Sequence, residues 1–194
     1  MLYYIAVAII RFLMFFVIRF KVEGVKNIPP EGGMILAVNH RSNYDPVFAA
    51  VACTRKLTFM AKAELFKNRL FGALLKNLGA FPINRGSGDI GAIKSAFSIL
   101  GAGKVMLIFP EGRRIKAGME SKAQPGVAMI AHRTGAPVVP TYIEGDVKWM
   151  HKITVTFGKP ITLDEYKDKK LNSEELQTVA NDILKEIHSL ASEK

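Results

Sequence analysis

A histidine and an aspartate that follow an apolar stretch could together perform acid–base chemistry. His40 and Asp45 come after the apolar run 34–38, which follows two glycines, is too short for a helix and predicts a buried strand. Five residues turn through roughly 500° in a helix, so the two side chains can meet only across a loop. A neutral imidazole accepts protons at physiological pH, and a neighbouring carboxylate can orient it. The sequence therefore predicts a strand, a loop with a base and a carboxylate, and then a helix.

Asp45 also has a purely structural interpretation. Pro46 follows it directly, and proline suits the first position of a helix, which we expect over residues 46–54. An aspartate before that proline is typical of an N-cap residue. On this interpretation Asp45 only caps the helix and His40 is an incidental loop residue, so these two residues alone leave both interpretations open.

Four stretches of the chain, taken together, resemble the sequence blocks of the glycerolipid acyltransferase family. The first is the H-x-x-x-x-D pair of His40 and Asp45. The other three are F-P-I-N-R at 81–85, F-P-E-G-R-R at 109–114 and V-V-P-T-Y at 138–142, in the same order as in the family. The blocks span residues 38–142, which is most of the chain.

The resemblance implies transfer of a fatty acyl group from an acyl thioester to the free hydroxyl of lysophosphatidic acid, in phospholipid biosynthesis. His40 would remove the hydroxyl proton, and Asp45 would fix the imidazole tautomer, as in a Ser-His-Asp triad whose nucleophile comes from the substrate. No G-x-S-x-G pattern is present, in agreement with this. Backbone amides in the His40 loop or around Glu111 and Gly112 are candidates for stabilising the oxyanion.

The resemblance also implies a set of residues that bind the phosphorylated acceptor. Arg85 and Arg114 occupy the family's arginine positions, and a guanidinium offers phosphate two parallel hydrogen bonds. The remaining expected substrate-binding residues are Lys62, in a stretch similar to the family's A-K-x-E-L, together with Glu111, Gly112 and Lys122. Arg113 and Ile115 depart from the family's usual threonine and serine. The acceptor could therefore be another lysolipid or an amino-acid lipid.

The charge balance indicates an anionic partner. The 194 residues contain 27 Lys and Arg and 17 Asp and Glu, a formal net charge of +10. This suits an acidic acyl carrier protein or acyl-coenzyme A as donor, a lysophospholipid acceptor and an anionic membrane. A non-enzymatic basic module that binds membrane or nucleic acid is the alternative from another class. No recognition helix or RNA-stacking motif supports nucleic acid as a partner.

The N-terminal segment is the one membrane signal in the sequence. Residues 1–18 are apolar except for Arg11, which disfavours a spanning helix. At helical spacing Tyr4, Arg11 and Arg19 share a narrow sector beside a wide apolar arc. We therefore predict a membrane-interface helix over 1–20 with this basic line toward the headgroups, and an acyltransferase domain over 21–194, peripheral or monotopic on the cytoplasmic face. A helix packed wholly within the domain is the alternative.

Strand and helix patterns alternate along the rest of the chain. They predict a single α/β domain with a central mixed sheet flanked by helices. Residues 61–77 are expected to form one helix, and Asn172 with Glu175 predicts a capping box for a final helix. The G-x-G-x-x-G match at 86–91 is more simply explained as a turn after Arg85.

Neither a metal nor another cofactor is expected. His132, His151 and His188 lack the spacing of metal ligands. The lone Cys53 excludes an intramolecular disulfide and lies in an apolar stretch, so we expect it to be a core residue.

Overall fold

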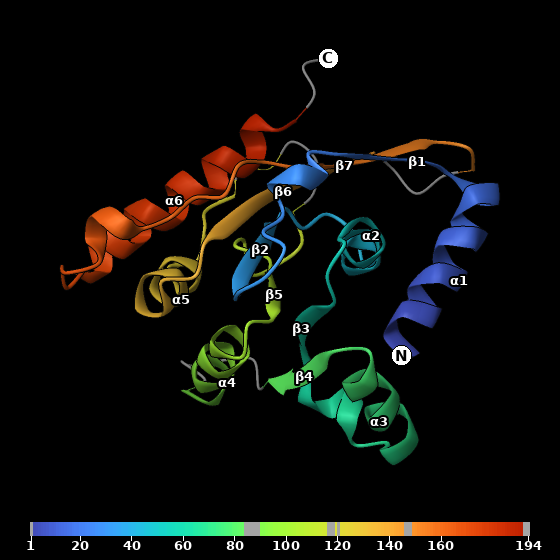
Figure 1. The fold of residues 1–194 in the computed structure, drawn as a ribbon, viewed down its shortest axis with the longest axis horizontal. Coiled ribbons are helices and arrows are strands. Elements are labelled where there is room, and N and C mark those ends of the chain that lie inside the picture. The colour runs from blue at the N-terminus through green and yellow to red at the C-terminus, as the bar shows by residue number, and fades with distance from the viewer. Residues whose placement is uncertain (1, 84–89, 116–118, 120, 146–148, 192–194) are drawn as a thin grey trace.

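A mixed sheet forms the centre of the protein (Figure 1). The computed structural model describes the chain except for residues 1, 84–89, 116–118, 120, 146–148 and 192–194. The sheet has seven strands in the order β1-β7-β6-β2-β5-β3-β4. The strands are β1 (Arg19–Glu23), β2 (Met34–Val38), β3 (Leu57–Lys62), β4 (Ala80–Ile83), β5 (Val105–Ile108), β6 (Val138–Glu144) and β7 (Lys152–Phe157).

Most strands of the sheet run in one direction. The pairs β6–β2, β2–β5, β5–β3 and β3–β4 are all parallel, whereas β7 is antiparallel to β6, with β1 parallel to β7. The predicted mixed α/β sheet is therefore confirmed. Because five neighbouring strands are parallel, their carboxyl ends meet at one edge, which is where open α/β sheets bind ligands.

The central strand β2 is buried on both faces. All five of its residues are buried. Successive side chains point to opposite faces of a strand, so Ile35 and Ala37 join one core, while Met34, Leu36 and Val38 join the other. This double burial explains why the stretch is a continuous apolar run rather than an alternating one.

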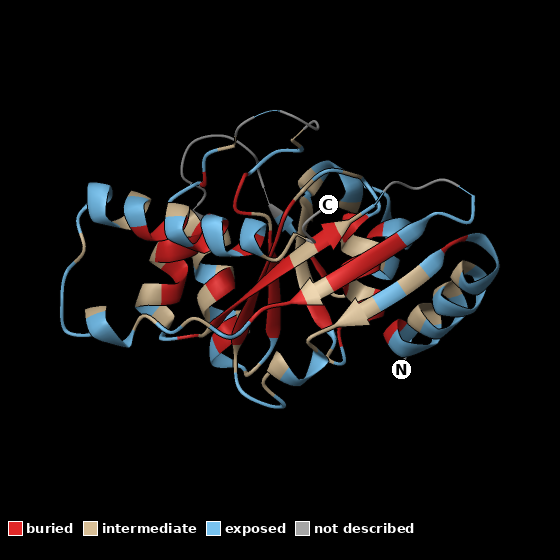
Figure 2. Cartoon of the chain, turned by 90° about the horizontal axis from the view of Figure 1, so that it is seen from above, coloured by how far each residue is buried: buried red, intermediate tan, exposed pale blue. Residues whose placement is uncertain are grey.

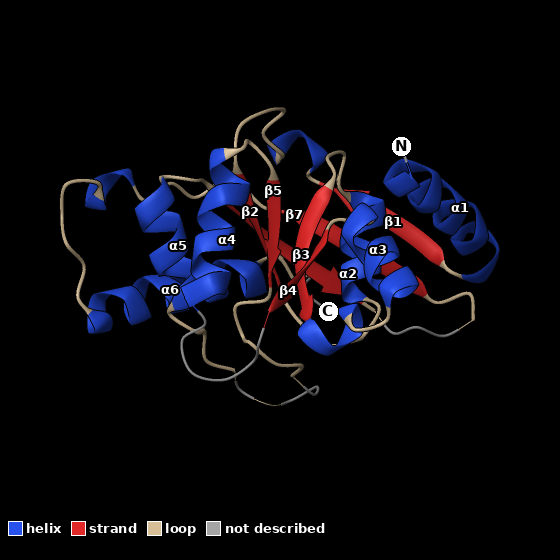
Figure 3. Cartoon of the chain, turned by 90° about the horizontal axis from the view of Figure 1, so that it is seen from below, coloured by secondary structure: helices blue, strands red, loops and turns tan. Residues whose placement is uncertain are grey.

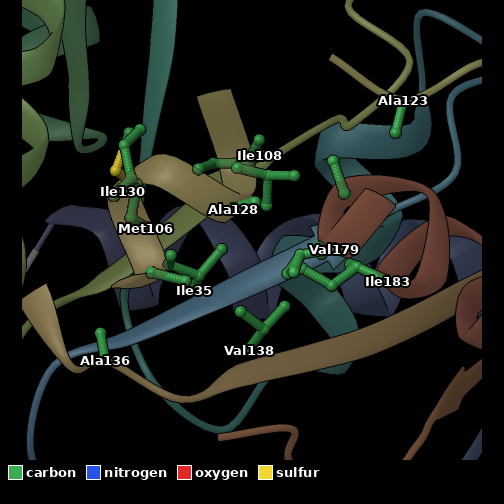
Figure 4. Close-up of a cluster of buried hydrophobic side chains, with 14 of the residues drawn as sticks. Ile35, Met106, Ile108, Ala123, Ala128, Ile130, Ala136, Val138, Val179 and Ile183 are labelled. Carbon is green, nitrogen blue, oxygen red and sulfur yellow. The ribbon is translucent and has the colours of Figure 1, made fainter. Parts of the chain in front are cut away.

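Helices cover both faces of the sheet (Figure 1). One face is packed by α4 (Ile90–Gly101), α5 (Gly126–Thr134) and α6 (Ser173–Ser189), and Figure 4 shows Val179 and Ile183 of α6 meeting Ile35 and Val138 of the strands. On the other face α2 (Asp45–Ala52) packs on the sheet, with α1 (Leu2–Val17) outside it. The α6 helix begins with the predicted capping box of Asn172 and Glu175.

The predicted helix over 61–77 is wrong in its first half. Strand β3 continues to Lys62, a short 3-10 helix η2 (Ala63–Phe66) follows, and only then does α3 (Arg69–Asn77) begin. Asn68 is the N-cap of α3, since its side chain accepts a hydrogen bond from the Phe71 N–H at 3.0 Å. Two further 3-10 helices are η1 (Val25–Asn27) and η3 (Asp164–Tyr166).

The α1 helix contacts the domain through its polar residues. The Tyr3 hydroxyl accepts a hydrogen bond from the Leu57 N–H at 3.1 Å, and burial raises the pKa of Tyr3 to about 12. The Arg11 guanidinium donates to the Val51 carbonyl at 2.7 Å, in the last turn of α2. This side chain satisfies a carbonyl that α2 leaves without a helical partner, and Arg11 is otherwise exposed. Its predicted position at lipid headgroups stays a prediction.

Much of the remaining surface of α1 is apolar and exposed. Figure 2 contrasts the buried strands with this helix. Its exposed large apolar residues are Leu2, Tyr4, Ile5, Ile9, Phe12, Leu13, Phe15, Phe16 and Val17. In the part of the chain that the structure describes, no helix combines the length and apolarity needed to cross a bilayer.

Candidate active site

The loops that follow β2 and β5 meet at the carboxyl edge of the sheet. These strands are direct neighbours, with Ala37 paired to Ile108, so Asn39 and His40 lie beside Phe109. The rings of His40 and Phe109 stack, with centroids 4.0 Å apart and planes 20° from parallel. Two of the blocks singled out in the sequence therefore come together in space.

His40 and Asp45 form the predicted pair. Nδ1 of His40 lies 2.9 Å from Oδ2 of Asp45. The carboxylate is 3 % exposed, whereas the imidazole is only partly buried. Because Nδ1 faces the carboxylate, Nε2 is the ring atom left to exchange a proton with a bound substrate.

Asp45 is not the N-cap residue of α2, contrary to the structural interpretation of the sequence. It is the first residue of the helix, after Tyr44 at the N-cap position. Its Oδ2 accepts hydrogen bonds from the backbone N–H groups of Arg41 at 2.7 Å and Ser42 at 2.6 Å, both upstream. The carboxylate therefore holds the loop in the shape that returns His40 to it.

Two further contacts fix the position of His40. The Phe109 ring packs against one face of the imidazole, and the Ile115 N–H donates to the His40 carbonyl at 2.8 Å. Phe109 begins the F-P-E-G-R-R block and Ile115 follows it, so this segment supports the histidine from the side of β5. The imidazole is thus held through its ring face, its Nδ1 atom and its backbone.

Asn39 is a positioning residue that the sequence analysis missed. Its side-chain amide donates to the Ile143 carbonyl at 3.0 Å and accepts from the Ile143 N–H at 2.7 Å. These bonds continue the β2–β6 ladder beyond its last pair, Val38 and Thr141, with a side chain in place of the backbone. The backbone after Asn39 is thereby free to turn toward Phe109. A polar residue directly after a wholly apolar strand is the signal that could have revealed it.

Glu111 brings a buried carboxyl group to the same place. It is 4 % exposed, and its Oε2 atom has no hydrogen-bond partner among the described residues. Burial raises the pKa of Glu111, while backbone hydrogen bonds from Glu111 and His40 oppose the shift. A buried acceptor with spare capacity beside His40 can take a hydrogen bond from a substrate.

Gly112 shapes the turn after β5. Its φ is 67°, in the left-handed region, and its N–H donates to the Phe109 carbonyl at 3.0 Å. The N–H groups of Gly112, Arg41 and Ser42 all bond to protein oxygens. The expectation that backbone amides of these two segments stabilise an oxyanion stays a prediction. Gly112 contributes through its backbone conformation.

The predicted basic residues differ in how close to His40 the structure places them. Arg114 directly precedes Ile115, whose N–H binds the His40 carbonyl, and its side chain is exposed. Lys62 ends β3 at the same edge of the sheet and is also exposed. Lys122 precedes Ala123, which hydrogen-bonds to α6. In the described part of the chain, no hydrogen bond or ion pair joins Lys62 or Lys122 to His40.

Arg85 and most of the G-x-G-x-x-G match, residues 86–89, lie outside the described residues. The structure places only their neighbour: Ile83 of β4 pairs with Lys62 of β3. Among the described residues, no three His, Cys, Asp or Glu side chains gather as metal ligands would. Cys53 is buried in the core that contains α2, as predicted.

The site is a His–Asp pair at the carboxyl edge of a parallel sheet. Comparison with known proteins identifies the family of enzymes to which the chain belongs. Residues 19–144 match the model of the Acyltransferase family, and the chain belongs to this family.

Two proteins similar to this chain are both named 1-acyl-sn-glycerol-3-phosphate acyltransferase. The chain is 34% identical over 166 residues to a 1-acyl-sn-glycerol-3-phosphate acyltransferase of Streptococcus pneumoniae, covering 82% of this chain and 61% of that protein. It is 32% identical over 126 residues to the Bacillus subtilis protein of the same name, covering 64% and 62%. The chain thus spans about three fifths of the length of both relatives.

The fold matches a solved structure. The crystal structure of the 1-acyl-sn-glycerophosphate acyltransferase from Thermotoga maritima superimposes with a TM-score of 0.69 at 24% identity, covering 91% of this chain and 73% of that one. At this identity the likeness shows the shared fold. It places the sheet and its helices in the architecture of that enzyme.

Proposed function

We propose that the protein transfers a fatty acyl group from an acyl thioester to the free hydroxyl of lysophosphatidic acid, giving phosphatidic acid and a free thiol. The observation that carries the proposal is the 2.9 Å contact between His40 and Asp45 at the sheet edge. Membership of the Acyltransferase family and the names of the relatives support the reaction and the acceptor.

The proton follows a short path in this mechanism. His40 Nε2 accepts the hydroxyl proton as the acceptor oxygen attacks the thioester carbonyl carbon. Asp45 stabilises the imidazolium that forms. When the tetrahedral intermediate collapses, the carbon–sulfur bond breaks and the imidazolium returns the proton to the departing sulfur. A carbon–oxygen bond has replaced a carbon–sulfur bond, and His40 is neutral again.

The acceptor phosphate is bound by cations at the same edge. Arg85 and Arg114 supply guanidinium groups suited to two parallel hydrogen bonds with phosphate, and Lys62 adds a point charge. Lys122 is a further contributor to this positive field. Glu111 positions the acceptor through Oε2, and Gly112 sets the turn that directs this carboxyl group toward His40.

The partners follow from charge and from the exposed surface. An acyl carrier protein or acyl-coenzyme A serves as donor, since both are acidic and the chain carries a net charge of +10. The exposed apolar side of α1 holds the enzyme at an anionic membrane, on the cytoplasmic face, where the lysolipid lies. In this proposal residues 1–20 are the membrane-interface segment that precedes the acyltransferase domain of residues 21–194.

Thiol release tests the proposal directly. Purified protein is mixed with acyl-coenzyme A or an acyl carrier protein thioester, and with lysophosphatidic acid, lysophosphatidylcholine, monoacylglycerol or an amino-acid lysolipid in turn. We expect thiol release that depends on lysophosphatidic acid and equals the phosphatidic acid formed. Release without any acceptor would indicate a thioester hydrolase, and release only with another lysolipid would reassign the acceptor.

A further inference from the structure

A second exposed apolar surface lies on α3. Leu70 is 86 % exposed, and Phe71 and Leu74 are also exposed, as is Leu65 in the preceding η2. We refer to Leu65, Leu70, Phe71 and Leu74 as the α3 ridge. Soluble proteins rarely leave several large apolar side chains exposed side by side unless they meet a partner or a membrane.

The packing of α3 explains why these residues face outward. Gly72 is the buried residue of the helix, and a Cβ added there would lie 3.0 Å from the Phe66 carbonyl oxygen. At 100° per residue, Gly72 lies roughly opposite Leu70 and Leu74. The close approach through glycine therefore turns the leucines away from the domain, so the α3 ridge is a surface rather than a poorly filled part of the core.

Exposed basic side chains lie on the other side of α3 from the leucines of the α3 ridge, and directly before the helix. Arg69 and Lys76 are both exposed and lie two turns apart on one side of α3, and the exposed Lys67 precedes the helix. A helix with large apolar side chains on one side and basic side chains on another is typical of helices that lie in a membrane interface, where the cations meet anionic headgroups. The charge of the surface thus matches an anionic bilayer.

The end of α3 is close to the start of α1, where Tyr3 packs on the domain. The Lys56 ammonium donates to the Asn77 carbonyl at the end of α3 at 3.0 Å, and it lies 5.6 Å from the ring centroid of Tyr3 in α1. One lysine therefore touches both helices. Figures 1 and 3 both show α3 at the end of the molecule that carries α1 and α2, away from α5 and α6.

We propose that α3 is a second membrane contact, with Leu70 and Leu74 inserted between lipids and with Arg69 and Lys76 at the headgroups of an anionic bilayer. The proposal rests on the proposed function, because a lysolipid acceptor lies in a membrane. Two contacts hold the molecule in one orientation, whereas α1 alone leaves it free to rotate about that helix. Strand β3 passes through Lys62 and η2 into α3, so the second contact brings the catalytic edge toward the lipid.

A single tryptophan placed on the α3 ridge tests the proposal residue by residue. The chain has one tryptophan, Trp149, so the Trp149→Phe variant has no tryptophan fluorescence of its own. With Leu70→Trp added, we expect a blue-shifted emission on vesicles of equal parts phosphatidylglycerol and phosphatidylcholine, and quenching by lipids with brominated chains. Val25→Trp, at an exposed apolar position on η1, is the control and should show neither. Unchanged Leu70→Trp emission on vesicle-bound protein would overturn the proposal.

Flotation measures what the contact contributes. Leu70→Ser with Leu74→Ser should weaken binding to the same vesicles by about tenfold or more, since apolar burial is lost. Arg69→Glu with Lys76→Glu should weaken it by about fivefold per residue at low salt, and less at high salt. Val25→Ser and Lys185→Glu, the latter on α6, are the matched controls and should float normally.

The remaining outcomes separate this proposal from the proposed function. Normal flotation of the leucine variant, with a raised Michaelis constant only for a carrier-protein thioester, would make α3 a protein-docking site and overturn the membrane contact. Turnover on a short-chain, water-soluble acceptor should be unchanged in the leucine variant. If the Leu70→Trp reporter inserts into vesicles, yet the unsubstituted protein transfers no acyl group to any lysolipid, the proposed function fails and the membrane contact stands.

Discussion

The side-chain amide of Asn39 is hydrogen-bonded to both backbone groups of Ile143, as a neighbouring strand would be. The Asn39 side chain takes the place of the backbone at this position. The β2–β6 ladder therefore ends before His40, and the loop begins there. The position of the candidate base therefore depends on a residue that does no chemistry itself. Such a role can be measured as stability and as activity.

Asn39→Ala should lower the free energy of unfolding by roughly 2 kcal/mol or more, because it leaves the buried N–H and carbonyl of Ile143 unpaired. Asn27→Ala is the matched control, since Asn27 makes a single bond, to the Phe157 carbonyl at 2.9 Å, and should cost about half as much. Urea unfolding measures both. Equal losses of stability in the two variants would show that the second hydrogen bond to Ile143 adds nothing to the free energy of unfolding.

The sequence predicts the framework of this site well and its details less well. The apolar run of β2 predicted a strand and a loop, and the H-x-x-x-x-D spacing together with the family resemblance predicted that His40 meets Asp45. The structure confirms both. Whether the Asp45 carboxylate accepts from upstream or downstream amides depends on the loop conformation. Residue types do not determine that conformation, so the N-cap prediction was wrong.

The helices at the periphery were harder to predict for a related reason. The spacing of apolar residues shows that a helix has an apolar side but not which way that side faces. Arg11 was expected at the headgroups, and the spacing did not reveal its bond to Val51. The spacing predicted a helix over 61–77 without indicating that Leu70 and Leu74 lie at the surface. Both outcomes depend on tertiary packing.

Glu111 should make the protein less stable as the pH rises. Burial raises the pKa of Glu111 above its ordinary value of 4.5, so the folded state binds the proton more tightly than the unfolded state does. Stability from this group is complete below pH 4.5 and is lost as the pH rises through the raised pKa. Glu111→Gln should therefore gain stability relative to the unsubstituted protein as the pH increases, while losing turnover. Urea unfolding across this pH range would contradict the prediction if the difference between the two proteins stayed constant.

Arg114→Ala should raise the Michaelis constant for lysophosphatidic acid by about tenfold or more while leaving that for the thioester unchanged, because a charge-assisted bond to phosphate is lost. The effect should disappear with monoacylglycerol, which has no phosphate. Arg133→Ala, an exposed arginine in the last turn of α5, is the control. A higher constant for the thioester alone would assign Arg114 to the donor. The same comparison applies to Arg85.

Steady-state turnover of folded His40→Ala tests the central claim most directly. Removing the general base should lower turnover by about 10²–10⁴-fold, and Asp45→Asn should cost less because the imidazole remains. Circular dichroism should match that of the unsubstituted protein, and His151→Ala, at an exposed histidine away from Asp45, should remain fully active. The account predicts near-complete loss of acyl transfer in His40→Ala alone. Near-normal transfer by that variant would contradict it.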